Sequence, residues 1–333
     1  MKHPLIYPPG LAVLAGVSLV TPAFAVINID YVSVGNAGNA ADPATGSLYG
    51  AVSYAYRIAK NETTISQYAE FLNAVAKTDS YSLYNVSMTT SSINGISRSG
   101  SSGSFTYSVN PGSENKPITY VSWFDVARFC NWMQNGQKTG AGAALTAETG
   151  AYTLNGVTSG VSVSRTVGAT VWIPSENEWY KAAYYDPNKG GADVGGYWAQ
   201  ATQSNTMTSN DFGVAGAANY YDAHGYATYT GGTSWGITDV GAYGANSDSA
   251  YGTNDQAGNV WEWTEAIMSG SYRGLRGGSY SGDGSYLTSS YRAYWNPKTG
   301  NGDFGFRVAS VPEPSCLVLT LLASGMLVSR RKR

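Results

Sequence analysis

The residues whose types suggest chemistry gather in one segment, 273–295, which reads RGLRGGSYSGDGSYLTSSYRAYW. It combines a glycine pair, serine and tyrosine hydroxyls and a Tyr-Arg step, as the core of an active site would. It has no cysteine, no histidine and a single carboxylate, Asp283. The groups that most often act as nucleophile, general base or soft-metal ligand are therefore scarce in it.

Cysteine and histidine are scarce in the whole chain, which contains only Cys130, Cys316, His3 and His224. His3 and Cys316 fall in terminal segments that we expect to be removed, so the mature protein keeps one residue of each type. A zinc site built from histidine and cysteine is nearly excluded, and so is a disulfide within the mature chain. His224 lies in YYDAHGYATYTGG, where a surface loop is favoured over a catalytic role.

A second segment with chemical potential is DQAGNVWEW, residues 255–263. Asp255 and Glu262 place carboxylates on either side of a Gly-Asn turn. Ca²⁺ binds about six to eight oxygen ligands, and backbone carbonyls often complete the set. The segment therefore favours a calcium site. The alternative is a turn whose Val260, Trp261 and Trp263 only pack in the core.

Both ends of the chain have the character of export signals. Residues 1–25 contain Lys2, an apolar run over 10–20 and Ala-Phe-Ala at 23–25, which predicts a cleaved signal peptide rather than a membrane anchor. Residues 312–333 contain Pro-Glu-Pro, an apolar run over 316–328 and the basic end RRKR. This order resembles the PEP-CTERM sorting tail of Gram-negative bacteria, which implies processing by an exosortase; the alternative is a plain tail anchor.

The mature chain would cover about residues 26–311, long but possible for one domain. Without the two ends its formal net charge changes from −2 to −6. A mildly acidic, exported chain without a basic face is not expected to bind nucleic acid.

Three segments carry sequence signals for the start of a helix, and these helices are expected to position the candidate site residues. Capping boxes are predicted at Thr64 with Gln67, Ser122 with Asp125 and Ser175 with Glu178. Each precedes an apolar stripe at helical spacing. Gly136 and Pro187 are expected to end the second and third helices.

Strand and turn patterns fill the rest of the chain. YAYRIAK, GSFTYSV, GAYTLNG and GFRVAS read as short strands, and residues 188–255 read as long loops.

Six segments in this order resemble the sulfatase-modifying-factor family, whose founding member is the formylglycine-generating enzyme. They are RIAKNETTISQYAEFLN, ITYVSWFDVARFCNWM, WIPSENEWYKAA, DQAGNVWEWTEA, RGLRGGSY and GFRVAS. The resemblance covers about residues 54–309 and implies an α+β fold, a variant of the C-type lectin fold with few helices, short strands and much irregular loop. We expect a signal peptide at 1–25, a lead-in at 26–53, the family domain at 54–310 and the sorting tail at 311–333.

The resemblance also shows which family chemistry this chain lacks. In the formylglycine-generating enzymes two cysteines after Gly-Gly-Ser-Tyr bind copper(I), for which thiolates are well suited. Those positions are Gly282 and Leu287 here, so no copper is expected. An iron-dependent branch that makes carbon–sulfur bonds needs several histidines and an extra domain, and is disfavoured because the mature chain would keep only His224.

The family's calcium sites carry over more completely. The resemblance implies ligands at the Asp255 side chain, the Gly258 and Val260 carbonyls and the Glu262 carboxylate, and this calcium would be structural. A second site would begin at Asn219 and Tyr220, with no downstream carboxylate assigned to it.

A set of aromatic and polar residues near the C-terminus is the expected ligand surface: Tyr280, Asp283, Tyr286, Tyr291, Arg292, Tyr294 and Trp295. Aromatic faces beside a few polar groups suit a saccharide or peptide. Packing in the core or at its rim is the alternative for each aromatic residue, and a structural role is favoured for Arg292 and Arg307.

We therefore expect an exported, non-catalytic binding module, processed by signal peptidase and exosortase. It would pass through the inner membrane to the surface and contact an exopolysaccharide or a cell-surface protein. A family enzyme with altered chemistry and a structural matrix protein are the alternatives.

Overall fold

The computed structural model describes residues 26–207, 209–222 and 236–312. The expected signal peptide, the apolar part of the expected sorting tail and His224 lie outside these ranges. No helix within them combines the length and the apolar character needed to span a membrane.

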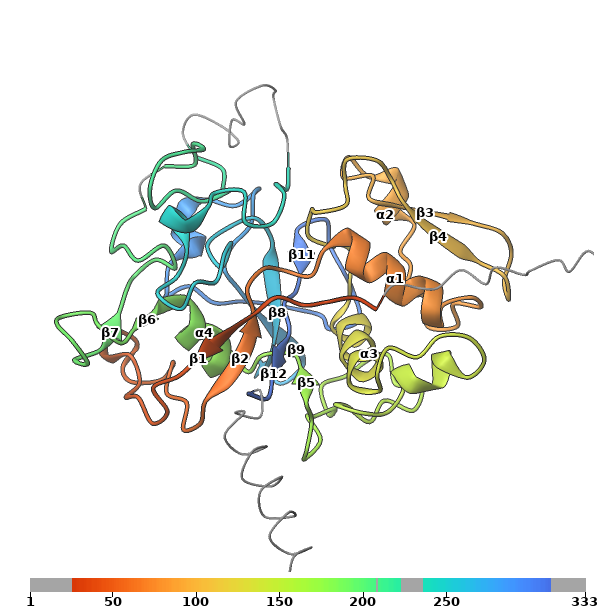
Figure 1. Ribbon diagram of the computed structural model, residues 1–333, viewed down its shortest axis with the longest axis horizontal. Helices are drawn as coiled ribbons and strands as arrows, with labels where there is room; N and C mark the ends of the chain where they lie inside the picture. The colour runs from red at the N-terminus through yellow and green to blue at the C-terminus, as the bar shows by residue number, and fades with distance from the viewer. Residues whose placement is uncertain (1–25, 208, 223–235, 313–333) are drawn as a thin grey trace, which may run out of the picture.

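Two four-stranded sheets form the centre of the molecule (Figure 1). The first has the order β1-β2-β12-β5 and is antiparallel throughout. Its strands are β1 (Tyr31–Val34), β2 (Tyr56–Ala59), β12 (Ala309–Ser310) and β5 (Val171–Trp172). The first and last described strands therefore lie on either side of β2.

The second sheet has the order β10-β9-β8-β11. Its strands are β10 (Ala293–Trp295), β9 (Tyr272–Arg276), β8 (Trp261–Met268) and β11 (Phe304–Gly305). β8 and β9 form an antiparallel hairpin whose register shifts between Trp263 and Ile267. β11 pairs with β8 in parallel, with Phe304 opposite Trp261, and this pairing brings the chain's last loop to the start of β8.

The three predicted capping boxes are confirmed. Each begins a helix with both reciprocal hydrogen bonds present: α1 (Ile65–Val75), α3 (Trp123–Gln134) and α4 (Glu176–Tyr184). Gly136, just beyond α3, has a φ of 77°, as expected for a left-handed helix end. The shorter elements are α2 (Ser87–Thr90), the 3₁₀ turns η1 (Pro43–Thr45), η2 (Ala143–Ala147), η3 (Ala245–Ser247) and η4 (Gly284–Leu287), and the hairpins β3 (Ile96–Ser99) with β4 (Thr106–Val109) and β6 (Tyr185–Asp186) with β7 (Gly196–Tyr197).

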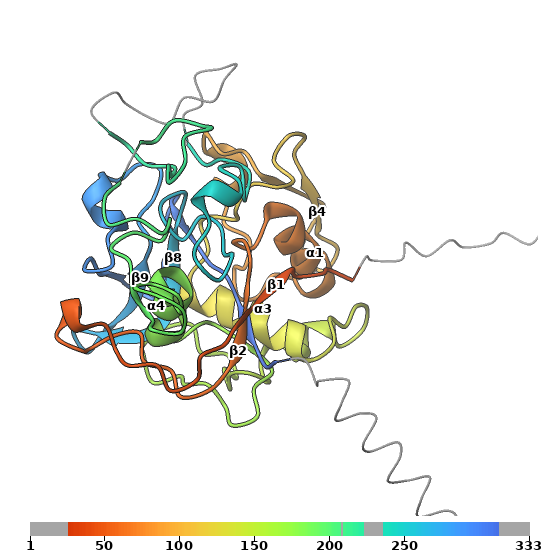
Figure 2. The ribbon, with the colours of Figure 1, turned by 60° about the vertical axis from the view of Figure 1, so that its left-hand side comes forward.

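Helices cover both faces of the second sheet, with α3 and α4 on opposite sides of β8 (Figures 1 and 2). Trp123 of α3 donates its indole N–H to the Thr264 carbonyl at 3.1 Å. Trp179 of α4 donates to Glu262 Oε2 at 2.8 Å. All three indoles at this centre, including that of Trp263, are buried and hydrogen-bonded, as buried tryptophans usually are.

The structure differs from two of the predicted strands. GAYTLNG is not a strand: within it only an isolated bridge joins Tyr152 to Arg165, because Asn131 of α3 binds both the amide and the carbonyl of Tyr152. GFRVAS begins within β11 and ends in β12, so it joins the two sheets. In the described parts of 188–255, the short elements Gly196–Tyr197 and Ala245–Ser247 are the only regular structure, which confirms the prediction of long loops.

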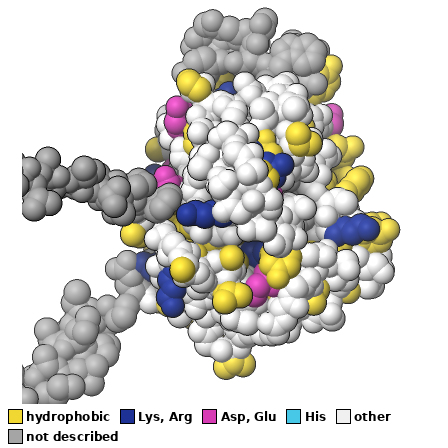
Figure 3. Space-filling view, turned by 90° about the vertical axis from the view of Figure 1, so that its right-hand side faces the viewer, with side chains coloured by type: hydrophobic (Ala, Val, Ile, Leu, Met, Phe, Trp, Pro, Cys, Tyr) yellow, Lys and Arg dark blue, Asp and Glu magenta, His cyan; other side chains and the backbone are white. Residues whose placement is uncertain are grey.

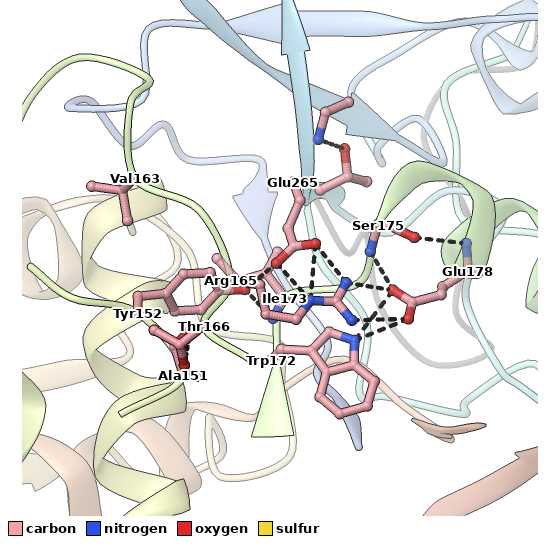
Figure 4. A network of polar contacts seen from close by, with 12 residues as sticks. Ala151, Tyr152, Val163, Arg165, Thr166, Trp172, Ile173, Ser175, Glu178 and Glu265 are labelled. Atoms are coloured by element: carbon pink, nitrogen blue, oxygen red, sulfur yellow. Dashed lines mark hydrogen bonds and ion pairs between the residues drawn. The ribbon is translucent and has the colours of Figure 1, made fainter. Parts of the chain in front are cut away.

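An ionic network fastens α4 to β8 (Figure 4). Arg165 lies between two carboxylates, with 2.9 Å from its Nη2 to Glu178 Oε2 and 2.5 Å to Glu265 Oε2. Glu178 is the third helical residue of α4 and also accepts from the Ser175 amide and the Trp172 indole. One guanidinium therefore joins a loop, a helix start and a central strand.

Candidate functional site

Aromatic rings gather near the start of β8, η4 and β10, and we call four of them the aromatic shelf: Trp261, Tyr286, Tyr291 and Trp295. The first three pack against one another with tilted rings, and Trp295 packs on Phe304. Tyr286 and Tyr291 lie 4.6 Å apart between ring centroids, and both lie about 6 Å from Trp261. Trp295 and Phe304 pack edge to face, with 5.7 Å between ring centroids. Tyr291 is 36% exposed and Trp295 49% exposed, so the shelf presents aromatic faces to solvent while Trp261 anchors it in the fold.

A carboxylate that the sequence did not reveal lies beside the shelf. Asp303 Oδ2 accepts hydrogen bonds from the hydroxyls of Ser279 at 3.0 Å and Ser281 at 3.2 Å. Its Oδ1 is buried and has no hydrogen-bond partner in the described part of the chain. Burial raises the pKa of Asp303. Asp303 directly precedes β11, and its carbonyl accepts the Trp261 amide where β11 joins β8. The pairing of these two strands therefore brings Asp303 to the shelf.

The structure brings three of the seven predicted ligand residues together on the shelf, and alternation along β10 separates two others. Trp295 lies opposite Arg273, whose guanidinium covers Trp123 of α3, so Trp295 and, by alternation, Tyr291 face the α3 side. Arg292, which binds Glu176 of α4, and Tyr294 face the other side. Arg292 forms a two-pronged hydrogen bond with Glu176 of α4, with both distances 2.6 Å. It therefore has the structural role that the sequence favoured, although its partner is a carboxylate. Tyr294 packs against Tyr272 with tilted rings, whose centroids lie 5.2 Å apart.

The remaining two predicted residues lie at the edges of the segment. Asp283 caps η4 by accepting the Ser285 amide at 2.8 Å, and it is fully exposed. Tyr280 donates its amide to the Asn259 carbonyl at 2.9 Å. Asp283 therefore adds a negative charge to the surface, and Tyr280 joins the segment to the predicted calcium turn.

The predicted calcium residues lie in a buried cluster of charge around Arg307. Glu262 binds Arg307 through both carboxylate oxygens, at 2.7 and 2.8 Å. Arg307 also donates to the carbonyls of Ala59, Lys60 and Asn254, which confirms its predicted structural role. Glu62 and Asp255 also lie within the field of this guanidinium. Three buried carboxylates thus share one buried positive charge.

Burial and the excess of negative charge in this cluster raise the pKa values of Glu62 and Asp255. Burial raises the pKa of Asp255 to about 6, and burial together with the charge of Asp255 raises the pKa of Glu62 well above its usual range. Glu62 Oε2 is buried without a partner among the described residues. Two buried carboxylates that repel one another need either a shared proton or a cation.

This cluster fits a calcium ion in charge and in oxygen chemistry. A divalent cation would neutralise the two carboxylates that Arg307 does not, and Asp255 with the Gly258 and Val260 carbonyls offers hard oxygens. Glu262 could add only one lone pair of Oε1, because Oε2 already accepts from Arg307 and Trp179 and Oε1 also accepts from Arg307. In the described residues no group of three His, Cys, Asp or Glu side chains is arranged around a metal position, so backbone carbonyls would have to complete the set.

The second predicted site lies against the first. Asn219 bridges to Gly258 in parallel, and its carbonyl accepts the Asn259 amide at 2.8 Å. Its side chain donates to Asn259 Oδ1 at 3.1 Å, and the Tyr220 carbonyl accepts from Asn210 at 2.9 Å. Asn219 and Tyr220 thus take part in a network of amides next to the turn.

Comparison with known proteins places this arrangement in a family. The family model described as "Sulfatase-modifying factor enzyme 1-like domain" matches residues 34–311. The chain belongs to this family. The match begins at Val34, the last residue of β1, and includes the loop that precedes the segment in which the sequence resemblance begins.

Relatives of this sulfatase-modifying-factor domain include one curated enzyme. Hercynine oxygenase of Mycolicibacterium smegmatis is 32% identical over 148 residues, which cover 38% of this chain and 29% of that protein. The chain thus spans less than a third of that relative's length.

Two solved structures share the fold. Treponema denticola variable protein 1 has a TM-score of 0.52 and 20% identity, with 87% of this chain and 98% of that chain covered. CarF has a TM-score of 0.50 and 19% identity, with 86% and 100% covered. With few helices and short strands, the structure and these neighbours confirm the predicted α+β family fold.

The positions at which the formylglycine-generating enzymes are expected to carry cysteines have other roles in this domain. Leu287 is fully buried and packs in a cluster with Trp179, Tyr180 and other residues. A Cβ atom on Gly282 would lie 2.8 Å from the ring of Tyr286. Shelf and core side chains therefore occupy the space that a thiolate pair would need.

Proposed function

We propose that this sulfatase-modifying-factor domain is a non-catalytic binding module that contacts a saccharide or protein ligand with its aromatic shelf. The observation that supports this most is the shelf itself. Exposed Tyr291 and Trp295 stand beside the Ser279–Ser281–Asp303 group, at the place where the family's copper enzymes would hold thiolates. Aromatic faces with a few fixed polar groups suit recognition rather than redox chemistry.

In the same proposal calcium is a structural ion. It would be held by Asp255, the Gly258 and Val260 carbonyls and the remaining lone pair of Glu262, with Asn219 and Tyr220 next to it. Its charge would relieve the repulsion between Glu62 and Asp255. The segment that it stabilises leads through Tyr280 to the shelf, so calcium would support the ligand surface without contacting the ligand.

We also propose that the protein acts outside the cytoplasm. The support is the order of residues at both ends: a signal-peptide pattern at 1–25, and Pro-Glu-Pro, an apolar run and four basic residues at 312–333. Signal peptidase and an exosortase would be the processing partners, and the product would be released or held at the surface of a Gram-negative cell. Cell fractionation with mass spectrometry of the mature C-terminus tests this, since a protein that keeps residues 316–333 would contradict processing.

The curated relative favours an enzyme as the second candidate function. Hercynine oxygenase shares 32% identity over part of this chain, and an altered oxygenase chemistry would need an acid or base at the shelf. Asp303 is the buried carboxylate there. Turnover of any candidate substrate that is abolished by Asp303→Asn, with binding retained, would support the enzyme and overturn the binding module.

A glycan array tests the proposed function. The purified protein is applied with calcium and again with a chelator. We expect binding to one class of sugar, stronger with calcium. Failure to bind glycans or an extracellular matrix fraction at either calcium level, with the fold intact by circular dichroism, would contradict it; self-association without a ligand would instead point to a structural matrix protein.

A further inference from the structure

A pocket separate from the aromatic shelf opens at the N-terminal end of α3. Its volume is about 290 Å³, near the lower limit of roughly 300 Å³ for small-molecule sites. Three segments line it: the loop at 81–85, the first turns of α3 and the loop at 298–300, with Thr158 at the rim. It lies towards the side of the molecule that bears α1, α3 and the β3–β4 hairpin, where the described side chains are mostly uncharged and the basic ones are scattered (Figure 3).

A buried charged group supports the pocket wall. Arg128 is entirely buried, and its Nε and Nη2 donate to Glu148 at 2.6 and 3.3 Å. Its Nη1 has only a contact of 3.5 Å with the Phe124 carbonyl, which is at the limit for a hydrogen bond. The ring of Tyr81 lies 4.0 Å over the guanidinium and also lines the pocket. Nη2 also donates to the Val157 carbonyl at 3.1 Å. Arg128 therefore lies behind the pocket wall, where it holds the Tyr81 ring and the Glu148 carboxylate in place.

Hydrogen-bonding groups of both kinds surround this arginine. Asp125 Oδ2 accepts the Ser122 amide at 2.7 Å, and Asn85 Oδ1 accepts the Ser87 amide at 2.9 Å. Both side chains are thereby fixed in the pocket wall. The acidic groups here are Asp125 and, behind the wall, Glu148, and the basic groups are Arg128 and Lys298. Burial raises the pKa of Asp125 to about 7, so its carboxyl group can donate as well as accept a hydrogen bond near neutral pH. Such a wall favours a ligand with many neutral donors and acceptors over a strongly charged one.

The backbone of the wall is held in an unusual conformation. Tyr120 has a φ of 60°, although aromatic residues rarely adopt the left-handed region. Its amide donates to Asn301 at 2.8 Å, and Gly300 lies so close that a Cβ atom would be 2.3 Å from the Tyr120 carbonyl carbon. Strained residues persist where the surroundings fix them, often at ligand sites. The ring of Tyr120 is thus preorganised at the pocket.

We propose that this pocket binds one uncharged sugar residue, as a site distinct from the aromatic shelf. Tyr81 and Tyr120 would pack on the sugar ring, while Asn85 and Asp125 would bind its hydroxyls and Arg128 would hold the Tyr81 ring from behind. The pocket volume fits a single ring and not a chain. Since no shelf residue lines it, the inference holds whether or not the shelf binds a ligand.

Saturation-transfer NMR on the purified full-length chain tests the proposal. The probes are the methyl glycosides of glucose, galactose, mannose and N-acetylglucosamine, with glucuronic acid as a charged comparison. Thr158 is exposed at the rim, so Thr158→Trp should block the pocket without disturbing the core, and Thr158→Ser is its matched control. Tyr291→Ala removes a shelf ring and leaves the pocket intact.

We expect transfer to at least one neutral glycoside, with at least a tenfold weaker affinity in Thr158→Trp and Asn85→Ala and no change in Thr158→Ser or Tyr291→Ala. Transfer that Tyr291→Ala abolishes and Thr158→Trp leaves intact would place the sugar on the shelf, which overturns the pocket and retains the proposed function. Binding of glucuronic acid alone, or of no glycoside, would also overturn it.

Discussion

Arg165 stabilises the negative charges of two carboxylates, Glu178 and Glu265. Its guanidinium binds both and lies over the indole of Trp172 at 4.5 Å. Glu178 is completely buried, whereas Arg165 remains 22% exposed. Removing the arginine would leave a buried charge without a partner, which is far more costly than losing a surface ion pair.

We expect Arg165→Met to lower the free energy of unfolding by about 2 kcal/mol, less than for a fully buried pair because solvent reaches the arginine. Urea denaturation measures it. Arg98→Met is the matched control, because the Arg98 side chain is 33% exposed and pairs with one carboxylate, that of Asp79, whereas Arg165 pairs with two. We expect it to cost under about 1 kcal/mol. Equal costs for the two variants would contradict the role assigned to Arg165.

The same network predicts a dependence of stability on pH. Burial raises the pKa of Glu178, but hydrogen bonds and charge from Arg165 lower it more, so that its pKa in the folded protein is below 4.5. A lowered carboxylate pKa gives stability that is present above the pKa of the unfolded chain and is lost as pH falls through the folded pKa. Unfolding free energy should therefore decline below about pH 4.5, and less steeply in Glu178→Gln. A parallel decline in both proteins would contradict this.

At the scale of elements, local hydrogen bonds made the helices predictable. The Thr64–Gln67, Ser122–Asp125 and Ser175–Glu178 boxes each join residues three apart, so the sequence contains the whole signal. The GAYTLNG prediction was wrong because the peptide groups of Tyr152 are bound by Asn131, which lies 21 residues away. No local pattern records such a contact.

We expect Thr64→Ala to lower stability by about 1 kcal/mol, because it removes the oxygen that accepts the Gln67 amide at 3.2 Å. Thermal unfolding measures the change. Ser66→Ala, two residues further in the same helix, is the control and should be neutral or slightly stabilising because alanine favours helices. A Thr64→Ala protein as stable as the control would show that tertiary packing alone holds α1.

The candidate site was predictable where it depends on one segment. Tyr286, Tyr291 and Trp295 lie within ten residues of one another, and strand alternation decides which of their neighbours share their face. Asp303 was missed because the pairing of β11 with β8, on which its position depends, joins residues 43 apart in sequence, Phe304 and Trp261. Glu62 was missed for the same reason, since it meets Asp255 only in the folded protein.

At the scale of the whole molecule, the buried charge around Arg307 joins both sheets and the loop region. It includes Glu62 after β2, Asp255 before β8 and Glu262 within β8. A cation at this point would connect elements from three parts of the chain. Ligand binding to the native state alone raises stability by RT ln(1 + [L]/Kd), or about 2.7 kcal/mol at a hundredfold excess over Kd.

We therefore expect calcium to raise the melting temperature by several degrees and a chelator to reverse the rise. Asp255→Asn should remove most of this effect, because it takes away one of the two carboxylates that Arg307 does not neutralise and the only side chain proposed as a full ligand. Asp239→Asn, at an exposed position in the nearby loop, is the matched control and should keep it. A melting temperature that calcium does not change in the wild-type protein would contradict the structural calcium site.

The central claim is that the α3 side of β10 binds a ligand, and adjacent residues of that strand allow a direct test. Trp295 belongs to the aromatic shelf, whereas Tyr294 faces the opposite side of the sheet, and the two are similarly exposed. The measurement is the affinity of Trp295→Ala and Tyr294→Ala for the extracellular polysaccharide fraction, by calorimetry with calcium present. We predict at least a tenfold loss for Trp295→Ala and little change for Tyr294→Ala. Equal affinities in the two variants, or a loss in Tyr294→Ala alone, would contradict the account.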